Sequence, residues 1–144
     1  ALLQSIDAWE RRLARSAEAQ PDAVTLLDGL HARGARLAVL TRNTRDNALL
    51  TLKAAGLDRF FPDDQLVMGR DCATAKPDPA GIHELNRRWD AASHQVVMVG
   101  DWVHDVAAGR AAGCATALVV RHGPPPEPWL DYCDRVVEDL TTLL

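Results

Sequence analysis

The chain has 144 residues, of which 47% are hydrophobic and 25% are charged, and its formal net charge is -4. This length suits one domain with a real core, and the composition is ordinary for a globular protein. The basic residues are scattered, which argues against nucleic-acid binding, and no apolar run approaches the roughly 20 residues of a membrane-spanning helix. The three cysteines form no Cys-x-x-Cys pattern, so we expect reduced thiols in a cytoplasmic protein rather than a disulfide framework or a zinc site.

The N-terminal part of the chain predicts two helices. Apolar side chains recur at helical spacing over residues 2–18, with Arg and Glu between them, which indicates an amphipathic helix. They are Leu2, Leu3, Ile6, Trp9 and Leu13. Pro21 is tolerated at a helix start, and the apolar stripe that follows it runs to Gly34.

A strand and a helix are predicted next. Residues 36–40 form a short apolar run that is typical of a strand. The polar segment Thr41-Arg42-Asn43 follows this strand directly. Thr44 is a good N-cap for a helix through about Ala55, and Gly56 ends that helix in the C′ position.

The rest of the chain continues the alternation of strands and helices. We expect strands at 66–68, 95–99 and 115–120, a last edge strand at 134–137 and a terminal turn of helix at 140–144. Asp78 can cap a helix in which Pro79 takes the first position, and a second helix of small residues starts near Asp105. This order predicts an α/β fold with a mainly parallel sheet whose faces are covered by helices.

Three polar clusters follow strands of this predicted sheet. They are Thr41-Arg42-Asn43, the loop with Lys76, and Asp101 with Asp105. Ligands of open α/β sheets bind beyond the carboxyl ends of the strands. A Thr hydroxyl and a helix N-terminus suit a phosphate, Lys76 supplies positive charge, and a carboxylate such as Asp101 is a ligand that Mg²⁺ prefers. Asp105 would orient a metal-bound water.

These clusters carry a resemblance to a known family. The strand closing on Leu40-Thr41-Arg42-Asn43, the segment Ala75-Lys76-Pro77-Asp78-Pro79 and the run from Val99-Gly100-Asp101 to Asp105 resemble the second, third and fourth motifs of the haloacid dehalogenase-like hydrolases. Within this family, the chain most resembles the phosphatases with a helical cap that are similar to phosphoglycolate phosphatase. The resemblance covers about residues 20–122.

The resemblance implies a role for each matching residue. Thr41 and Lys76 would be catalytic residues that bind the phosphoryl group, Arg42 and Asn43 would assist in phosphate binding, and Asp101 and Asp105 would form the Mg²⁺ site.

The family's first motif, Asp-x-Asp-Gly-Thr, is missing from these 144 residues. Its first Asp is the nucleophile and its second the general acid and base. Asp28, in Leu27-Asp28-Gly29, lies inside a helical stripe and lacks the preceding Asp, so we do not take it as the nucleophile. We therefore expect the nucleophile upstream of residue 1.

The resemblance also implies a domain organisation. Residues 1–20 would be the last helix of a helical cap, and residues 21–144 a three-layer, Rossmann-like core that lacks its first strand. That strand would lie between the strands ending at Thr41 and Asp101. We expect a strand from outside residues 1–144, of the same or another chain, to fill the gap, or the two neighbouring strands to pair directly. The reason is that unpaired buried backbone groups are costly.

The function implied is Mg²⁺-dependent hydrolysis of a small phosphorylated metabolite through an aspartyl-phosphate, with residues 1–144 alone inactive. A non-catalytic module that binds phosphate and Mg²⁺ is the alternative outside enzymes, and 2-haloacid dehalogenation is the alternative reaction. A receiver-like phosphoacceptor domain would need its acceptor Asp between the metal pair and the Lys, and the order here is wrong for it. No nucleic acid or membrane is expected as a partner.

Overall fold

The computed structural model describes residues 2–144, which divide into two compact units, one up to Cys72 and one from Ala73 onward. The helices are α1 (Leu2–Arg15), α2 (Pro21–Ala32), α3 (Arg45–Ala54), α4 (Ala80–Trp89) and α5 (Val103–Ala111). The strands are β1 (Val39–Leu40), β2 (Val67–Met68), β3 (Val97–Gly100), β4 (Ala115–Val119) and β5 (Arg135–Val137). Short 3-10 turns lie at Asp58–Phe60, Asp64–Leu66, Ser93–Gln95, Glu127–Tyr132 and Leu140–Leu143.

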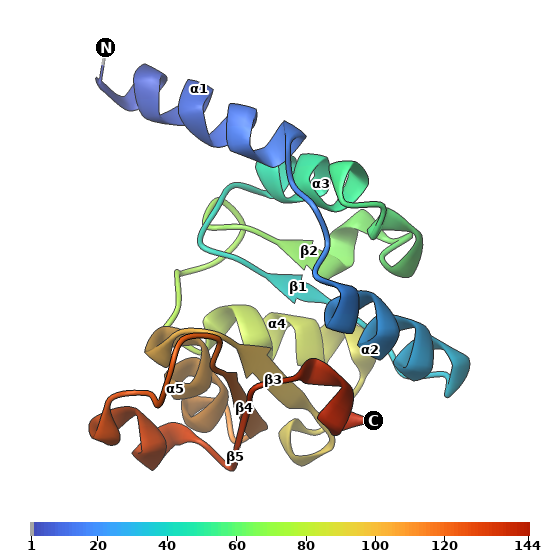
Figure 1. The fold of residues 1–144 in the computed structure, drawn as a ribbon, viewed down its shortest axis with the longest axis vertical. Coiled ribbons are helices and arrows are strands. Elements are labelled where there is room, and N and C mark those ends of the chain that lie inside the picture. Colours follow the sequence, from blue (N-terminus) through green and yellow to red (C-terminus); the bar gives the residue numbers. More distant parts are fainter. Residues whose placement is uncertain (1) are drawn as a thin grey trace. The chain divides into compact units, whose positions relative to one another are not determined.

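The first unit is built on the parallel pair β1–β2, in which Val39 pairs with Val67 and Leu40 with Met68. Helix α3 packs beside this pair, and α1 lies along α3 (Figure 1). A buried cluster made of Ala48, Leu52, Phe60, Phe61 and Val67 forms the core. Phe60 and Phe61, at the end of a 3-10 turn, thus belong to the core of the first unit.

The second unit is built on the parallel sheet β3–β4–β5, in which β5 is an edge strand as predicted. Helix α5 crosses β3 and β4 closely (Figure 1). Gly109 makes this approach possible, because a Cβ there would lie 2.7 Å from Met98 Cβ and 2.8 Å from Thr116 Cγ2. The small residues that the sequence places in α5 thus serve to bring the helix against the strands.

The strands are shorter than predicted, while the helix ends are close to their predicted places. The strand expected at 36–40 is hydrogen-bonded only at Val39–Leu40, and Leu66 belongs to a 3-10 turn. Thr44 caps α3, and Gly56 follows it with a positive φ of 69°, as expected. Pro79 is the N-cap of α4 rather than its first residue, and Asp78 Oδ1 accepts a hydrogen bond from Ala80 N–H at 2.8 Å.

Within residues 2–144, β1 and β3 belong to different sheets. Because these strands belong to separate compact units, both versions stay predictions: a strand from outside residues 1–144 between them, or direct pairing of the two. No helix in the described part of the chain is long and apolar enough to cross a membrane.

Candidate functional site

The loop after β1, residues Thr41–Asn43, is a tight connection into the N-terminus of α3. The Asn43 N–H donates to Thr41 Oγ1 at 3.1 Å, and Asn43 Oδ1 accepts from Thr44 N–H at 2.8 Å. Asn43 Oδ1 also accepts from Asn47 Nδ2 at 3.1 Å. The Asn43 amide oxygen thus stabilises the start of α3, and the Thr41 hydroxyl oxygen accepts the Asn43 N–H.

The segment after β2, residues Gly69–Asp71, holds this loop from one side. The Arg70 N–H donates to Asn43 O at 2.8 Å, and Asp71 Oδ1 accepts from Arg45 N–H at 2.9 Å. The hydrogen bond from the Arg45 N–H lowers the pKa of the Asp71 carboxyl. A Cβ at Gly69 would overlap the Arg45 nitrogen and come within 2.6 Å of Asn43 O, so only glycine fits where the two loops meet.

Arg70 joins this segment to α1. Its guanidinium forms a bidentate pair with Glu10, with N–O distances of 3.2 and 3.0 Å, and Asp7 lies 3.7 Å away. The hydrogen bond to Glu10 raises the pKa of the Arg70 guanidinium above its ordinary value. The pairing of Arg70 with Glu10 could not be predicted from the sequence, because 60 positions separate the two residues and no local pattern links them.

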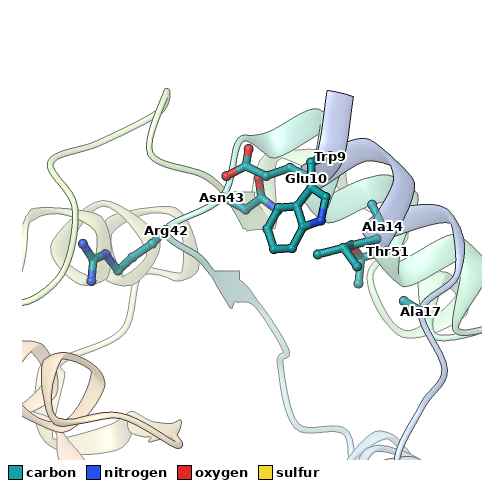
Figure 2. A pocket seen from close by; sticks show the side chains of 8 residues that line it. Trp9, Glu10, Ala14, Ala17, Arg42, Asn43 and Thr51 are labelled. Carbon is teal, nitrogen blue, oxygen red and sulfur yellow. The ribbon is translucent and has the colours of Figure 1, made fainter. Parts of the chain in front are cut away.

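A cavity of about 430 Å³ lies beside α1 and the Thr41–Asn43 loop. Trp9 and Glu10 point toward Asn43 at its wall, whereas the Arg42 side chain points away from the indole (Figure 2). The remaining lining residues are Leu13, Ala14, Ala17 and Thr51. The cavity is therefore mainly apolar, with polar groups at the end near the loop.

In the second unit, Lys76 and Asp105 form a buried ion pair. Lys76 Nζ lies 2.7 Å from Asp105 Oδ1, and the two side chains are only 9% and 11% exposed. Asp105 Oδ2 accepts hydrogen bonds from the N–H groups of Asp101 and Trp102 at 3.2 and 3.0 Å. Both oxygens of Asp105 are therefore used to hold the Lys76 ammonium and the turn at Asp101.

Gly100 is what allows Asp105 to lie there. A Cβ at Gly100 would overlap the Asp105 side chain. The Gly-Asp pair at the end of β3 thus has a packing reason as well as a chemical one.

Asp101 follows β3 directly and is exposed. No three His, Cys, Asp or Glu side chains within residues 2–144 are grouped so that they could hold a metal ion. Mg²⁺ keeps several waters and uses one or two carboxylates together with substrate phosphates. Asp101 fits as one such ligand, whereas Asp105, with both oxygens engaged, fits as a residue that orients its neighbours. Of the two predicted metal ligands, only Asp101 is thus exposed, while Asp105 is buried.

Beside Asp101, Trp102 is 54% exposed and packs edge to face on Trp129. The ring centroids are 4.8 Å apart at an interplanar angle of 68°. Asp28, which was set aside as a nucleophile, lies on α2 and is exposed beside Arg59, at 3.5 Å.

The chain matches a known protein family over most of its length. The family model described as haloacid dehalogenase-like hydrolase matches residues 2–119. The chain belongs to this family. The family assignment and the α/β class with parallel sheets, both predicted from the sequence, are thereby confirmed.

The sequence is similar to several proteins named as pyrophosphatases. The chain is 38% identical over 90 residues to "Pyrophosphatase PpaX" of Halalkalibacterium halodurans, which covers 62% of the chain and 41% of the relative. It is 33% identical over 117 residues to the protein of the same name from Listeria welshimeri, which covers 80% and 52%. The chain thus spans about half the length of the curated relatives it matches.

Solved structures of the family share the fold. A predicted phosphoglycolate phosphatase from Haemophilus somnus has a TM-score of 0.75 and 26% identity, covering 85% of the chain and 54% of its own. A structure described as a dehalogenase has a TM-score of 0.79 and 26% identity, covering 92% of the chain and 57% of its own. The chain is accordingly a hydrolase-family domain that is similar to phosphatases.

Proposed function

We propose that the chain is part of a Mg²⁺-dependent phosphomonoester hydrolase that works in the cytoplasm on a small phosphorylated metabolite. The observation that best supports this proposal is the buried Lys76–Asp105 pair next to the exposed Asp101. A carboxylate pair in which one member holds a lysine and the other is open suits a ligand that carries negative charge and a divalent cation. In this proposal residues 1–20 belong to a helical cap and residues 21–144 to the core.

Each residue has a defined task in the proposed reaction. The Thr41 hydroxyl donates to a phosphoryl oxygen, with the Arg42–Asn43 backbone and the N-terminus of α3 adding positive potential. The Lys76 ammonium binds a second phosphoryl oxygen and offsets the charge that develops during transfer, while Asp105 holds that ammonium in place.

Asp101 would be a protein ligand of Mg²⁺, which when bound would stabilise the charge of the transferring phosphoryl group. The nucleophile, an Asp upstream of residue 1, would form an aspartyl-phosphate that water then hydrolyses, and a second Asp would act as general acid and base. The strand that carries them would complete the sheet, either from the same polypeptide or from another chain.

The first substrates to test come from the names of the relatives. Several are called pyrophosphatases and one solved structure is called a phosphoglycolate phosphatase, so inorganic pyrophosphate and small phosphomonoesters form the first panel. Release of phosphate should depend on Mg²⁺ in the natural polypeptide that contains these residues. Turnover of a 2-haloacid without metal would instead favour dehalogenation, the reaction named for another solved neighbour.

The decisive experiment uses purified residues 1–144, verified by mass. We expect this chain to bind inorganic phosphate but to release none from pyrophosphate or an aryl phosphate, because it supplies binding groups and no nucleophile. Mg²⁺-dependent turnover by this chain would contradict the proposal. If the natural polypeptide also binds phosphate and hydrolyses none of the panel, the chain is a binding module instead.

A further inference from the structure

The Arg70 guanidinium makes three hydrogen bonds to two groups of the first unit, the Glu10 carboxylate and the Arg42 carbonyl. Nη1 donates to Glu10 Oε1 at 3.2 Å and to the Arg42 carbonyl oxygen at 3.1 Å, and Nη2 donates to Glu10 Oε2 at 3.0 Å. Glu10 lies on α1, and Arg42 lies in the loop that we propose binds phosphate. One side chain therefore bridges a helix and the middle of that loop.

The backbone of the same residue fixes the next peptide of the loop. The Arg70 N–H donates to Asn43 O at 2.8 Å, so Arg70 holds two consecutive carbonyl groups, those of Arg42 and Asn43. The N–H groups of these two peptides, those of Asn43 and Thr44, donate to Thr41 Oγ1 and Asn43 Oδ1, so Arg70 also fixes the peptides that orient the Thr41 hydroxyl. Thr41 is fixed separately, through its N–H to Met68 O at 2.9 Å.

Arg70 and Glu10 form an ion pair with two hydrogen bonds, a geometry that makes such pairs strong. It is bidentate and charge-assisted, the Glu10 side chain is only 19% exposed, and Asp7 adds a second carboxylate at 3.7 Å. A lysine could keep the charge but could not reach both Glu10 oxygens and the Arg42 carbonyl, because its three donors radiate from one atom.

We propose that Arg70 is a positioning residue that couples the placement of α1 to the phosphate affinity of the Thr41–Asn43 loop. The inference rests on the proposed phosphate site. When Glu10 holds the guanidinium, Nη1 of Arg70 also donates to the Arg42 carbonyl, and the loop keeps the shape in which the Thr41 hydroxyl can meet a phosphate. When α1 moves away, that carbonyl loses its partner and the loop loses its shape.

Such coupling is reciprocal, because if α1 favours phosphate binding, then phosphate must favour the docked α1 by the same factor. Phosphate should therefore slow hydrogen exchange of the amides in α1 (Leu2–Arg15), although none of these amides needs to contact it. A purely local role of Arg70 in folding would not produce this effect.

The experiment measures the affinity of residues 1–144 for inorganic phosphate in the wild type and in four variants. Arg70→Gln and Arg70→Lys are each expected to weaken binding about fivefold or more, the lower end of usual coupling factors. Retention of wild-type affinity by Arg70→Lys would show that only charge matters and would overturn the proposal.

Glu10→Gln provides a test of sign. It removes a negative charge that is linked to the loop through Arg70. Electrostatic repulsion alone predicts that phosphate then binds more tightly, whereas positioning by Arg70 predicts that phosphate binds more weakly. Glu18→Gln, an exposed acidic residue beyond the end of α1, is the matched control for loss of charge and should leave the affinity unchanged. Tighter binding in both Gln variants would refute the coupling.

The hydrogen-exchange readout separates this inference from the proposed function. In the wild type, phosphate should protect α1, and in Arg70→Gln saturating phosphate should not. If the wild type binds no phosphate, the proposed site itself fails and the coupling fails with it. If the wild type binds phosphate and α1 is protected equally in Arg70→Gln, the phosphate site stands and only the coupling is wrong.

Discussion

Single residues in the second unit carry charge where water hardly reaches. Lys76 and Asp105 are about one-tenth exposed, so each depends on the other for the neutralisation that solvent would otherwise supply. Motif spacing indicates both residues. That both oxygens of Asp105 bind protein groups could not be predicted, because these contacts depend on the path of the chain between Gly100 and Val103.

Lys76→Met should destabilise the chain by roughly 3 kcal/mol or more, because it leaves the Asp105 carboxylate buried without its cation. Chemical denaturation measures this loss. The double variant Lys76→Met/Asp105→Asn should lose less than the sum of the two single variants, since the buried charges disappear together. Additive losses would mean that the two groups do not interact.

Gly100→Ala should push the Asp105 side chain away from Lys76 and lower stability by about 1–3 kcal/mol, the usual range for overpacking. Gly56→Ala is the control. Its φ of 69° costs about 1 kcal/mol with alanine, but the added methyl meets nothing within 4 Å. Only Gly100→Ala should alter Mg²⁺ or phosphate binding, as followed by isothermal titration calorimetry.

Glu84 gives a prediction for pH. Hydrogen bonds from Arg87 and then Arg88 lower the pKa of its carboxyl from 4.5 to about 2. A carboxyl whose pKa is lowered by folding adds stability above pH 4.5, and this contribution disappears as the pH falls through about 2.

Glu84→Gln should therefore lower the thermal midpoint at pH 7 more than at pH 2, by a small amount because water screens this surface cluster. A carbon-13 NMR titration should place the Glu84 midpoint near 2. A midpoint near 4.5 would show that the ion pairs do not persist in solution.

At the scale of elements, helices were easier to predict than strands. The ends of α3 are set by a capping threonine and a glycine with positive φ, both of which are visible in a few adjacent residues. The lengths of β1 and β2 depend on partners 28 residues apart in the chain, as in the pair Val39–Val67, so a local apolar run overestimates them.

Helix α1 shows what periodicity cannot decide. Its apolar stripe was correctly read as a helix, yet Leu2 and Leu3 are 75% and 77% exposed, and the buried residue of the helix is Ala14. The pattern established the helix but not which face meets α3. An apolar face of this kind on the surface favours association.

Replacing Leu3 and Ile6 by glutamine should leave the thermal midpoint nearly unchanged, since exposed substitutions usually change stability by less than about 0.5 kcal/mol. The same variant should bind less of a hydrophobic dye and aggregate less at high concentration. Leu52→Gln, in the buried core, is the comparison and should unfold the first unit. A large loss of stability in the Leu3/Ile6 variant would mean that the stripe is covered in solution.

At the scale of the whole molecule, the proposed phosphate-binding residues are divided between the two units, with Thr41, Arg42 and Asn43 in one and Lys76 in the other. Motif order in the sequence assigned them to one ligand, through the family resemblance. The pairing of Arg70 with Glu10 and the cavity at Trp9 could not be predicted, because both arise from long-range packing of α1.

If Thr41 and Lys76 both belong to the proposed phosphate site, Thr41→Val and Lys76→Met should each weaken phosphate binding to residues 1–144. The loss of a neutral hydrogen bond should cost about fivefold, and that of a charge-assisted one about tenfold or more. Nuclear magnetic resonance titration with inorganic phosphate measures both. A variant that binds as tightly as the wild type would remove its residue from the proposed site.

The edge-to-face contact of Trp102 and Trp129 gives the chain an optical signal of its own. Two indoles at 4.8 Å and 68° have coupled electronic transitions, which produce a circular dichroism couplet whose sign and size follow their mutual angle. Because Trp102 is the neighbour of Asp101 in the chain, any ligand that reorders this turn will change the couplet. Binding at the end of β3 can thus be followed spectroscopically without a label, and Trp129→Phe removes the signal.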